Sequence, residues 1–276
     1  MQKNKILLST GSILWMNVKD AIAFAHDTGF DGIELVPTKK VVTDFLNQPL
    51  DSLSYITSIK SLHQNWRFDA GLDKEYGINL MPSLLALTIR LIFFPKVTIS
   101  EKYLSNISKF LNIPVVVHSI NQKWTRDKDG KEFAGGILYE IFNIKNQNKA
   151  TIKKWLYDKK HNVVVDTRDD QSLVWAKNQG FKDWTDFWNW IGLKKIGNVQ
   201  LTLIGTKGIK KILNHKKSLA ETQLLWLRKH KWKGSVTVEV NPLTLCVLNK
   251  GNLKTGLKTI ASFVQQTLRE RKNWST

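Results

Sequence analysis

Acidic and histidine side chains stand at the ends of several short apolar stretches of this sequence. Three valines run directly into Asp166, and similar stretches end at His63, His118, Glu140 and Glu239. Carboxylates and imidazoles are the side chains that bind divalent metals and transfer protons near neutral pH. Their recurrence predicts one site for metal binding or acid–base chemistry, provided that the fold brings the ends of these stretches together.

The apolar stretches themselves predict the elements that would do this. A short run rich in β-branched residues and bounded by turn residues is typical of a strand buried in a parallel sheet. Parallel α/β folds place their reactive groups at the carboxyl ends of such strands, and Glu34 in GIEL fits the same pattern. The strands expected on this basis are 5–10, 30–36, 60–66, 113–119, 137–143, 162–170, 199–205 and 235–242.

Helices are expected between most of these strands. Asn17, Ser100 and Ser218 each precede an amphipathic segment and could cap its first turn. Further helices are expected over 50–59, 82–93, 148–160 and 251–271. The count of strand–helix alternations is about eight, which is the number of a (β/α)8 barrel. The fold class predicted is α/β, with residues 1–276 forming a single TIM barrel domain.

The charge, apolar runs and cysteine content of the chain bear on its partners and its location. The net charge is +19, but the basic residues occur in small scattered groups without a long basic block. This pattern favours a solvated lysine-rich surface over a specific nucleic-acid partner. No apolar run approaches the ~20 residues of a membrane span, and Cys246 has no second cysteine with which to pair. We therefore expect a cytoplasmic protein with no membrane partner.

Three segments resemble the xylose-isomerase-like barrels. DAIAFAHDTGFDGIEL is similar to their opening, NVVVDTRDD to their sixth strand, and LRKHKWKGSVTVEVNP to their closing strand. That superfamily includes sugar and sugar-phosphate isomerases and epimerases, and the endonuclease IV class of AP endonucleases. The resemblance implies a TIM barrel with a divalent metal at the carboxyl ends of its strands.

The resemblance also assigns roles to single residues. Glu140, Asp166 and Glu239 match metal ligands of the family, and His118 matches a histidine that binds metal in its AP endonucleases. A substrate-binding role is implied for four positions: Glu34, His63, Asp169 and Thr202. Thr202 and Asp169 depart from the family, because each stands where a histidine is usual.

The reaction implied is proton transfer next to a carbonyl of a sugar or sugar phosphate. Glu140 and Glu239 would exchange the proton while Asp166 holds the metal. With Thr202 in place of histidine, the oxygen ligands favour manganese or magnesium over zinc, or no metal at all. Two alternatives stay open: an endonuclease IV-like nuclease acting on nucleic acid, and a non-catalytic barrel. The sequence does not indicate the oligomeric state.

Residues outside the strand ends carry simpler expectations. His26, His161 and His230 are expected on helices or turns, in contact with solvent. The tryptophans between Ser172 and Gly192 are expected to pack a core or a subunit contact, since buried aromatics more often serve packing than ligand binding.

Overall fold

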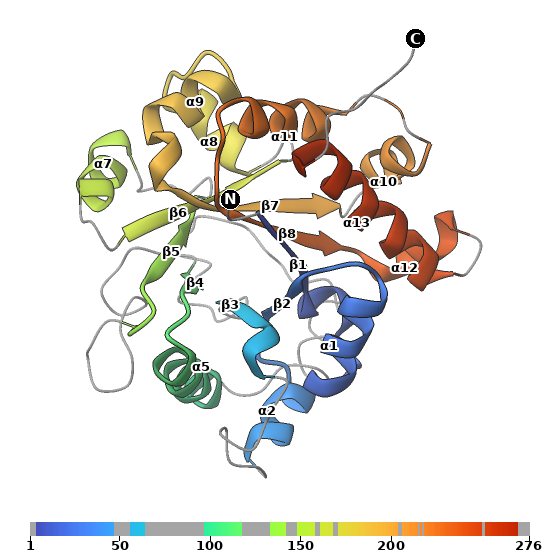
Figure 1. Cartoon of the computed structure of the whole chain (residues 1–276). Coiled ribbons are helices and arrows are strands. Elements are labelled where there is room, and N and C mark those ends of the chain that lie inside the picture. The colour runs from blue at the N-terminus through green and yellow to red at the C-terminus, as the bar shows by residue number, and fades with distance from the viewer. Residues whose placement is uncertain are drawn as a thin grey trace, which may run out of the picture.

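The computed structural model of the chain is a closed barrel of parallel strands surrounded by helices (Figure 1). It describes residues 4–46, 56–63, 97–117, 133–141, 148–157, 161–167, 171–203, 206–214, 216, 218–249 and 252–269. The strands pair in sequence order, and β8 closes the barrel by pairing with β1. They are β1 (Lys5–Ser9), β2 (Gly32–Leu35), β3 (Ile59–His63), β4 (Val115–Val117), β5 (Ile137–Glu140), β6 (His161–Asp166), β7 (Ile196–Leu203) and β8 (Ser235–Val240). The predicted (β/α)8 barrel is therefore confirmed.

The helices form the outer layer of the molecule (Figure 1). The α-helices are α1 (Val18–Asp27), α2 (Lys39–Leu46), α5 (Val97–Leu111), α7 (Lys149–Tyr157), α8 (Gln171–Asn178), α9 (Trp184–Ile191), α10 (Thr206–Leu213), α11 (Leu219–Lys229), α12 (Pro242–Leu248) and α13 (Leu253–Arg269). Short 3-10 helices occur at η1 (Thr10–Ile13), η3 (Ile56–Ser58) and η4 (Leu193–Lys195). None of the described helices is long and apolar enough to cross a membrane.

Capping explains where several helices begin. The Asn17 side chain accepts a hydrogen bond from the Asp20 amide at 2.7 Å, and Ser218 accepts one from the Glu221 amide at 3.1 Å. Both caps were predicted. The predicted cap at Ser100 is wrong, because α5 already begins at Val97 and Ser100 lies inside its first turn.

Some segments differ from the sequence prediction. Helices α10 and α12 were not predicted; α12 opens with Pro242 behind an Asn241 cap. Ile59 starts β3 and does not end a helix. The helix expected over 82–93 lies outside the described residues. These differences fall in the connections between strands, where the sequence pattern is weakest.

Two irregularities in strand pairing decide which side chains enter the barrel. Between β6 and β7 the register jumps from Val163↔Ile196 to Val164↔Asn198, leaving Gly197 as an extra residue. A Cβ at Gly197 would lie 2.6 Å from Leu138 Cδ2, so only glycine fits there without a shift. A bulge of this kind re-aims the residues that follow it. From Asn198 onward, alternate residues of β7 face the barrel lumen.

The second irregularity lies between β2 and β3. The pairing passes from Ile33↔Ile59 to Glu34↔Ser61, which leaves Lys60 as the extra residue. The shift places the Ser61 side chain directly beside Glu34. Both irregularities therefore deliver polar side chains to the lumen.

Among the described residues, buried apolar side chains form two separate regions. The larger lies between strands and helices and includes Val199, Leu201 and Leu203 of β7. The smaller is a cluster of Val116, Leu138 and Val164, from β4, β5 and β6. Since parallel barrels fill their interior with alternate side chains, this smaller cluster is an apolar part of the lumen.

Aromatic residues support the outer layer, as predicted. Trp175 and Trp188 are almost fully buried. The Trp175 ring contacts the Phe187 ring, and the Trp188 ring contacts the Trp226 ring. One histidine was predicted wrongly: His161 is buried at the start of β6, where it stacks on Trp155 with ring centroids 3.6 Å apart. A strand that begins one residue earlier than expected accounts for this.

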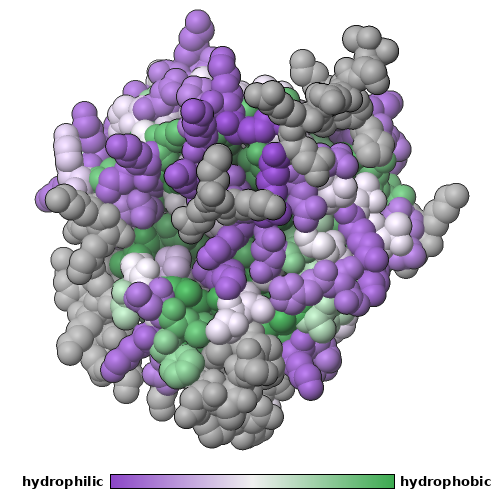
Figure 2. Space-filling model, in the orientation of Figure 1, coloured by the Kyte–Doolittle hydropathy of each residue, from purple (hydrophilic) through white to green (hydrophobic). Residues whose placement is uncertain are grey.

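His26 and His230 are exposed, in agreement with the prediction. Hydrophilic residues cover much of the face in Figure 2, and hydrophobic residues show between them nearer its centre.

Candidate active site

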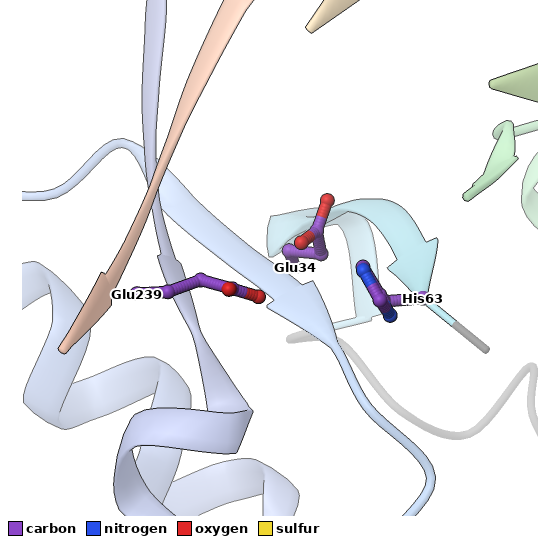
Figure 3. A group of neighbouring side chains, drawn as sticks. All are labelled: Glu34, His63 and Glu239. Atoms are coloured by element: carbon purple, nitrogen blue, oxygen red, sulfur yellow. The ribbon is translucent and has the colours of Figure 1, made fainter. Parts of the chain in front are cut away.

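Three side chains from three strands meet at the carboxyl end of the barrel. They are Glu34 of β2, His63 of β3 and Glu239 of β8, and they point toward one another in Figure 3. One carboxylate oxygen of each glutamate and one ring nitrogen of the histidine all lie within 4.8 Å of one another. Closure of the barrel through β1 makes this possible, because β8 and β2 both pair with β1.

Neighbouring hydroxyl groups hold Glu34 in place. The Ser61 hydroxyl donates to Glu34 Oε2 at 2.7 Å, and the Thr237 hydroxyl donates to the same oxygen at 3.2 Å. Thr237 in turn accepts from the Asn198 amide at 2.9 Å. The other oxygen, Glu34 Oε1, is buried without a hydrogen-bond partner among the described residues.

His63 connects this cluster with the opposite side of the barrel. Its Nε2 lies 3.3 Å from Glu140 Oε2, and both side chains are almost fully buried. Glu140 is the last residue of β5. A carboxylate that holds one ring nitrogen fixes the orientation of the ring and makes the histidine a better ligand.

Burial and charge oppose each other at these groups. Burial raises the pKa of the Glu34 carboxyl and the charge of Glu140 adds to this, while His63, Ser61 and Thr237 act to lower it. Burial would lower the pKa of His63, but the hydrogen bond to Glu140 and the charges of Glu34, Glu140 and Glu239 raise it to about 10. The cluster thus attracts positive charge strongly, as crowded buried carboxylates do.

Asp166 and Thr202 lie at the same end of the barrel. Asp166 is the last residue of β6 and is buried, and its register partner is Gln200. Thr202 is buried opposite Glu239, and its hydroxyl has no hydrogen-bond partner among the described residues. Neither side chain is part of the Glu34–His63–Glu239 group.

Two of the expected site residues, His118 and Asp169, lie outside the described residues. The ligand set that the resemblance implies, Glu140, Asp166, Glu239 and His118, is therefore only partly visible. Of this set, Glu239 belongs to the three-residue group and Glu140 contacts it through His63. Glu34, expected to bind substrate, lies among the potential ligands.

Gln200 is a polar residue of the lumen that the sequence analysis did not single out. It is fully buried in β7, and neither its amide nitrogen nor its amide oxygen has a hydrogen-bond partner among the described residues. The alternation of Asn198, Gln200 and Thr202 with apolar residues in NVQLTL was the available signal.

The residues present fit a divalent metal. Two carboxylates and one imidazole are donors that zinc, manganese and related ions accept. Three protein ligands leave coordination positions for water or substrate, as in catalytic sites. The unpartnered Glu34 Oε1 is a buried carboxylate oxygen with which a cation could pair. Glu34, His63 and Glu239 could therefore hold the ion.

Comparison with solved structures shows the same barrel in other proteins. The IolI protein, whose crystal structure contains a zinc atom, matches 96% of this chain and 98% of its own, with 15% identity and a TM-score of 0.55. L-ribulose 3-epimerase matches 96% of this chain and 94% of its own, with 11% identity and a TM-score of 0.55. A xylose isomerase domain protein from Salmonella typhimurium matches 98% of this chain and 99% of its own, with 10% identity and a TM-score of 0.53.

The chain therefore shares the (β/α)8 TIM barrel fold with these proteins. Neither a family model nor a curated protein sequence matches the chain. At these levels of identity the structural likeness concerns the fold, and fold does not determine activity. The chemistry must be argued from the side chains of this barrel.

Proposed function

We propose that this protein is a divalent-metal-dependent isomerase or epimerase of a sugar or sugar phosphate. The observation that carries the proposal is the meeting of Glu34, His63 and Glu239 at the carboxyl end of the barrel, with Glu140 joined to His63. The likeness to L-ribulose 3-epimerase and to the zinc-containing IolI protein supports it.

The residues divide between holding the ion and moving a proton. Glu34, His63 and Glu239 would hold the metal, which supplies Lewis acidity to a substrate oxygen when bound. Glu140 on β5 and Glu239 on β8 are separated by β6 and β7, so their carboxylates can face a substrate from two sides. One would remove a proton beside the carbonyl. The other would return a proton to the adjacent carbon in an isomerisation, or to the opposite face of the same carbon in an epimerisation. Because these carboxylates are largely buried, bulk water does not compete for the transferred proton.

The choice of metal follows from the donors. Oxygen ligands alone favour manganese or magnesium, which was the expectation from Glu140, Asp166 and Glu239. Including His63 adds an imidazole, a ligand that zinc and manganese accept more readily than magnesium. We propose manganese or zinc as the ion, with magnesium the weaker binder.

The test combines metal titration with a screen of ketoses and their phosphates. Wild type should bind one manganese or zinc ion and interconvert at least one ketose with its aldose or epimer. Glu239→Gln should lose both properties, because it removes a ligand charge and a proton acceptor. Asp27→Asn, which neutralises an exposed carboxylate on α1, is the matched control and should behave as wild type. Unchanged metal binding in Glu239→Gln would remove Glu239 from the site.

A second candidate is a barrel that binds a ligand without catalysis. It is favoured by the pKa of His63, because a protonated His63 would balance the carboxylates without a metal. This candidate would be supported if the wild-type protein bound neither manganese nor zinc and turned over no sugar. Efficient incision of an abasic DNA duplex would instead support a nuclease, for which the scattered lysines predict only weak, salt-sensitive DNA binding.

A further inference from the structure

The polar side chains of β7 are unusual for the lumen of a barrel. Asn198, Gln200 and Thr202 face the interior on alternate positions, and all three are buried. Such interiors are generally filled by branched apolar residues. Three polar side chains in a row on one strand therefore call for a physical reason.

Hydrogen bonding within the barrel accounts for only part of this row. The Asn198 amide donates to Ser235 at 3.0 Å and to Thr237 at 2.9 Å. Among the described residues, no partner satisfies Asn198 Oδ1, either amide atom of Gln200, or the Thr202 hydroxyl. Leaving a buried polar group without a partner lowers the stability of the fold. The unsatisfied atoms of this row are ones that the hydroxyl groups of a ligand could satisfy.

The position of Gln200 connects the row with the candidate active site. Gln200 is in register with Asp166 on one side and with Thr237 on the other. Thr237 donates a hydrogen bond to Glu34, and Thr202 lies beside Glu239. A molecule touching Gln200 would therefore lie directly below the groups that could hold the metal.

We propose that Gln200, with Thr202, forms a binding subsite for the neutral, hydroxyl-bearing end of a sugar or polyol, and that Gln200 determines specificity for it. This rests on the proposed function, because the same ligand would present its carbonyl to the cluster of Glu34, His63 and Glu239. The subsite includes Thr202, one of the two positions that depart from the family resemblance.

The chemistry of the groups defines the class of ligand. An amide offers two donors and one acceptor, and a hydroxyl group can satisfy both kinds of atom. Glu34 Oε1, buried near this row without a partner, can only accept a hydrogen bond while ionised. Asn198, Gln200 and Thr202 carry no positive charge with which a phosphate or carboxylate could pair, whereas ligand hydroxyls can pair with their amide and hydroxyl groups. The subsite therefore takes the uncharged end of the ligand.

The experiment compares two buried glutamines. Gln223 of α11 is also fully buried with both amide atoms unpartnered among the described residues, but it lies in the helical layer. Gln200→Leu removes a side-chain amide from the lumen, and Gln223→Leu removes one from the helical layer. Gln200→Met is a second variant if Gln200→Leu fails to fold. Binding of L-ribulose, D-fructose and xylitol is measured by calorimetry and by thermal shift, with manganese affinity measured separately.

We expect wild type and Gln223→Leu to bind at least one of these three compounds with equal affinity. Gln200→Leu should bind it about 10- to 100-fold more weakly, the loss expected for a buried amide that pairs with a ligand hydroxyl. Its manganese affinity should stay within about threefold of wild type, as expected for a residue that meets the ligand and not the metal.

Three results would overturn the subsite. They are equal sugar binding by Gln200→Leu and wild type, a parallel loss of manganese binding, and no binding of any of the three compounds by wild type. Since binding is measured without turnover, failure of the isomerase activity is distinguishable: a protein that binds xylitol through Gln200 but isomerises nothing retains the subsite and loses the proposed reaction.

Discussion

The two sides of the barrel lumen differ sharply in chemistry. On β4, β5 and β6 the inward side chains below the rim are Val116, Leu138 and Val164, which form a closed apolar cluster. We call this the apolar side. On β7, β8, β2 and β3 the inward side chains are polar; this polar side consists of Asn198, Gln200, Thr202, Thr237, Glu239, Glu34, Ser61 and His63.

The difference shows how one barrel separates stability from chemistry. The apolar side fills its part of the lumen with close-packed side chains, which contribute to folding through burial. The polar side buries hydroxyls, amides and carboxylates, some of them unsatisfied, which costs stability. Groups of that kind are retained where they serve binding or catalysis. The two sides meet at the contact of Glu140 with His63.

Among the variants that compare the two sides, breaking the contact between Glu140 and His63 should have the largest effect on turnover. Glu140→Gln keeps the shape of the side chain but removes the charge that faces His63 and the proton acceptor on β5. We expect turnover to fall about 10²- to 10⁴-fold, the usual contribution of a general acid–base group. Metal affinity should fall about 10- to 100-fold, because His63 loses the carboxylate that orients it.

Steady-state kinetics and manganese titration measure the two losses separately. The comparison with Glu239→Gln sharpens the assignment, since that variant should lose metal binding altogether. If Glu140→Gln turned over substrate at the wild-type rate, Glu140 would have no role in proton transfer and the apolar side would contribute structure alone.

Mutations on the apolar side should lower the free energy of unfolding and leave metal affinity unchanged. Leu138→Ala would empty part of the cluster next to Gly197, at a cost of about 2–5 kcal/mol in the free energy of unfolding. Metal affinity should be unchanged, because Leu138 packs with Val116 and Val164 and not in the group of Glu34, His63 and Glu239. Val174→Ala on α8 is the control: Val174 is 41% exposed and should change stability by less than about 0.5 kcal/mol. Chemical denaturation measures both.

Much of this arrangement could be predicted from local sequence. Glu140, Asp166 and His63 end their strands as the apolar runs predict, because a buried strand that stops at a charged residue has a recognisable pattern. The number of strands and the helix caps at Asn17 and Ser218 followed from the same local signals.

What could not be predicted depends on contacts between distant strands. The meeting of Glu34 with Glu239 requires β1 to pair with both β2 and β8. The exposure of Gln200 to the lumen depends on the extra residue Gly197, which shifts β7 relative to β6. A period-two pattern in the sequence indicates that one face is polar, but the register of neighbouring strands decides which way that face points.

A smaller loss is expected where the polar side supports the cluster indirectly. Thr237→Val preserves shape but removes the hydroxyl that donates to Glu34 and accepts from Asn198. Metal affinity should fall about tenfold, the lower end of the range for groups that orient a ligand. Stability should fall by about 1–2 kcal/mol, since Asn198 keeps only its bond to Ser235.

Thr267→Val provides the matched control. Thr267 is a buried threonine of α13 whose hydroxyl donates to the Phe263 carbonyl, outside the barrel lumen. It should change stability without changing metal affinity. Equal metal affinity in Thr237→Val and Thr267→Val would mean that Glu34 needs no support from β8.

The smallest effect is expected outside the barrel, at the ion pair of Asp27 with Lys254, which lie 2.8 Å apart on α1 and α13. The hydrogen bond from Lys254 and its charge hold the pKa of the Asp27 carboxyl below its ordinary value. A lowered folded-state pKa means that any stabilisation is present above the unfolded pKa and is lost as pH falls through the folded one. Both side chains are largely exposed, so solvent and salt screen the attraction.

Asp27→Asn should therefore leave the melting temperature at neutral pH unchanged within measurement. As pH falls below the ordinary pKa of aspartate, the melting temperature of the variant should decline less steeply than that of wild type. Thermal melts of wild type and variant across pH test this. A loss at neutral pH as large as that of Leu138→Ala would show that the surface between α1 and α13 stabilises this barrel as strongly as its apolar interior, and the contrast between the two sides of the lumen would no longer describe where the stability lies.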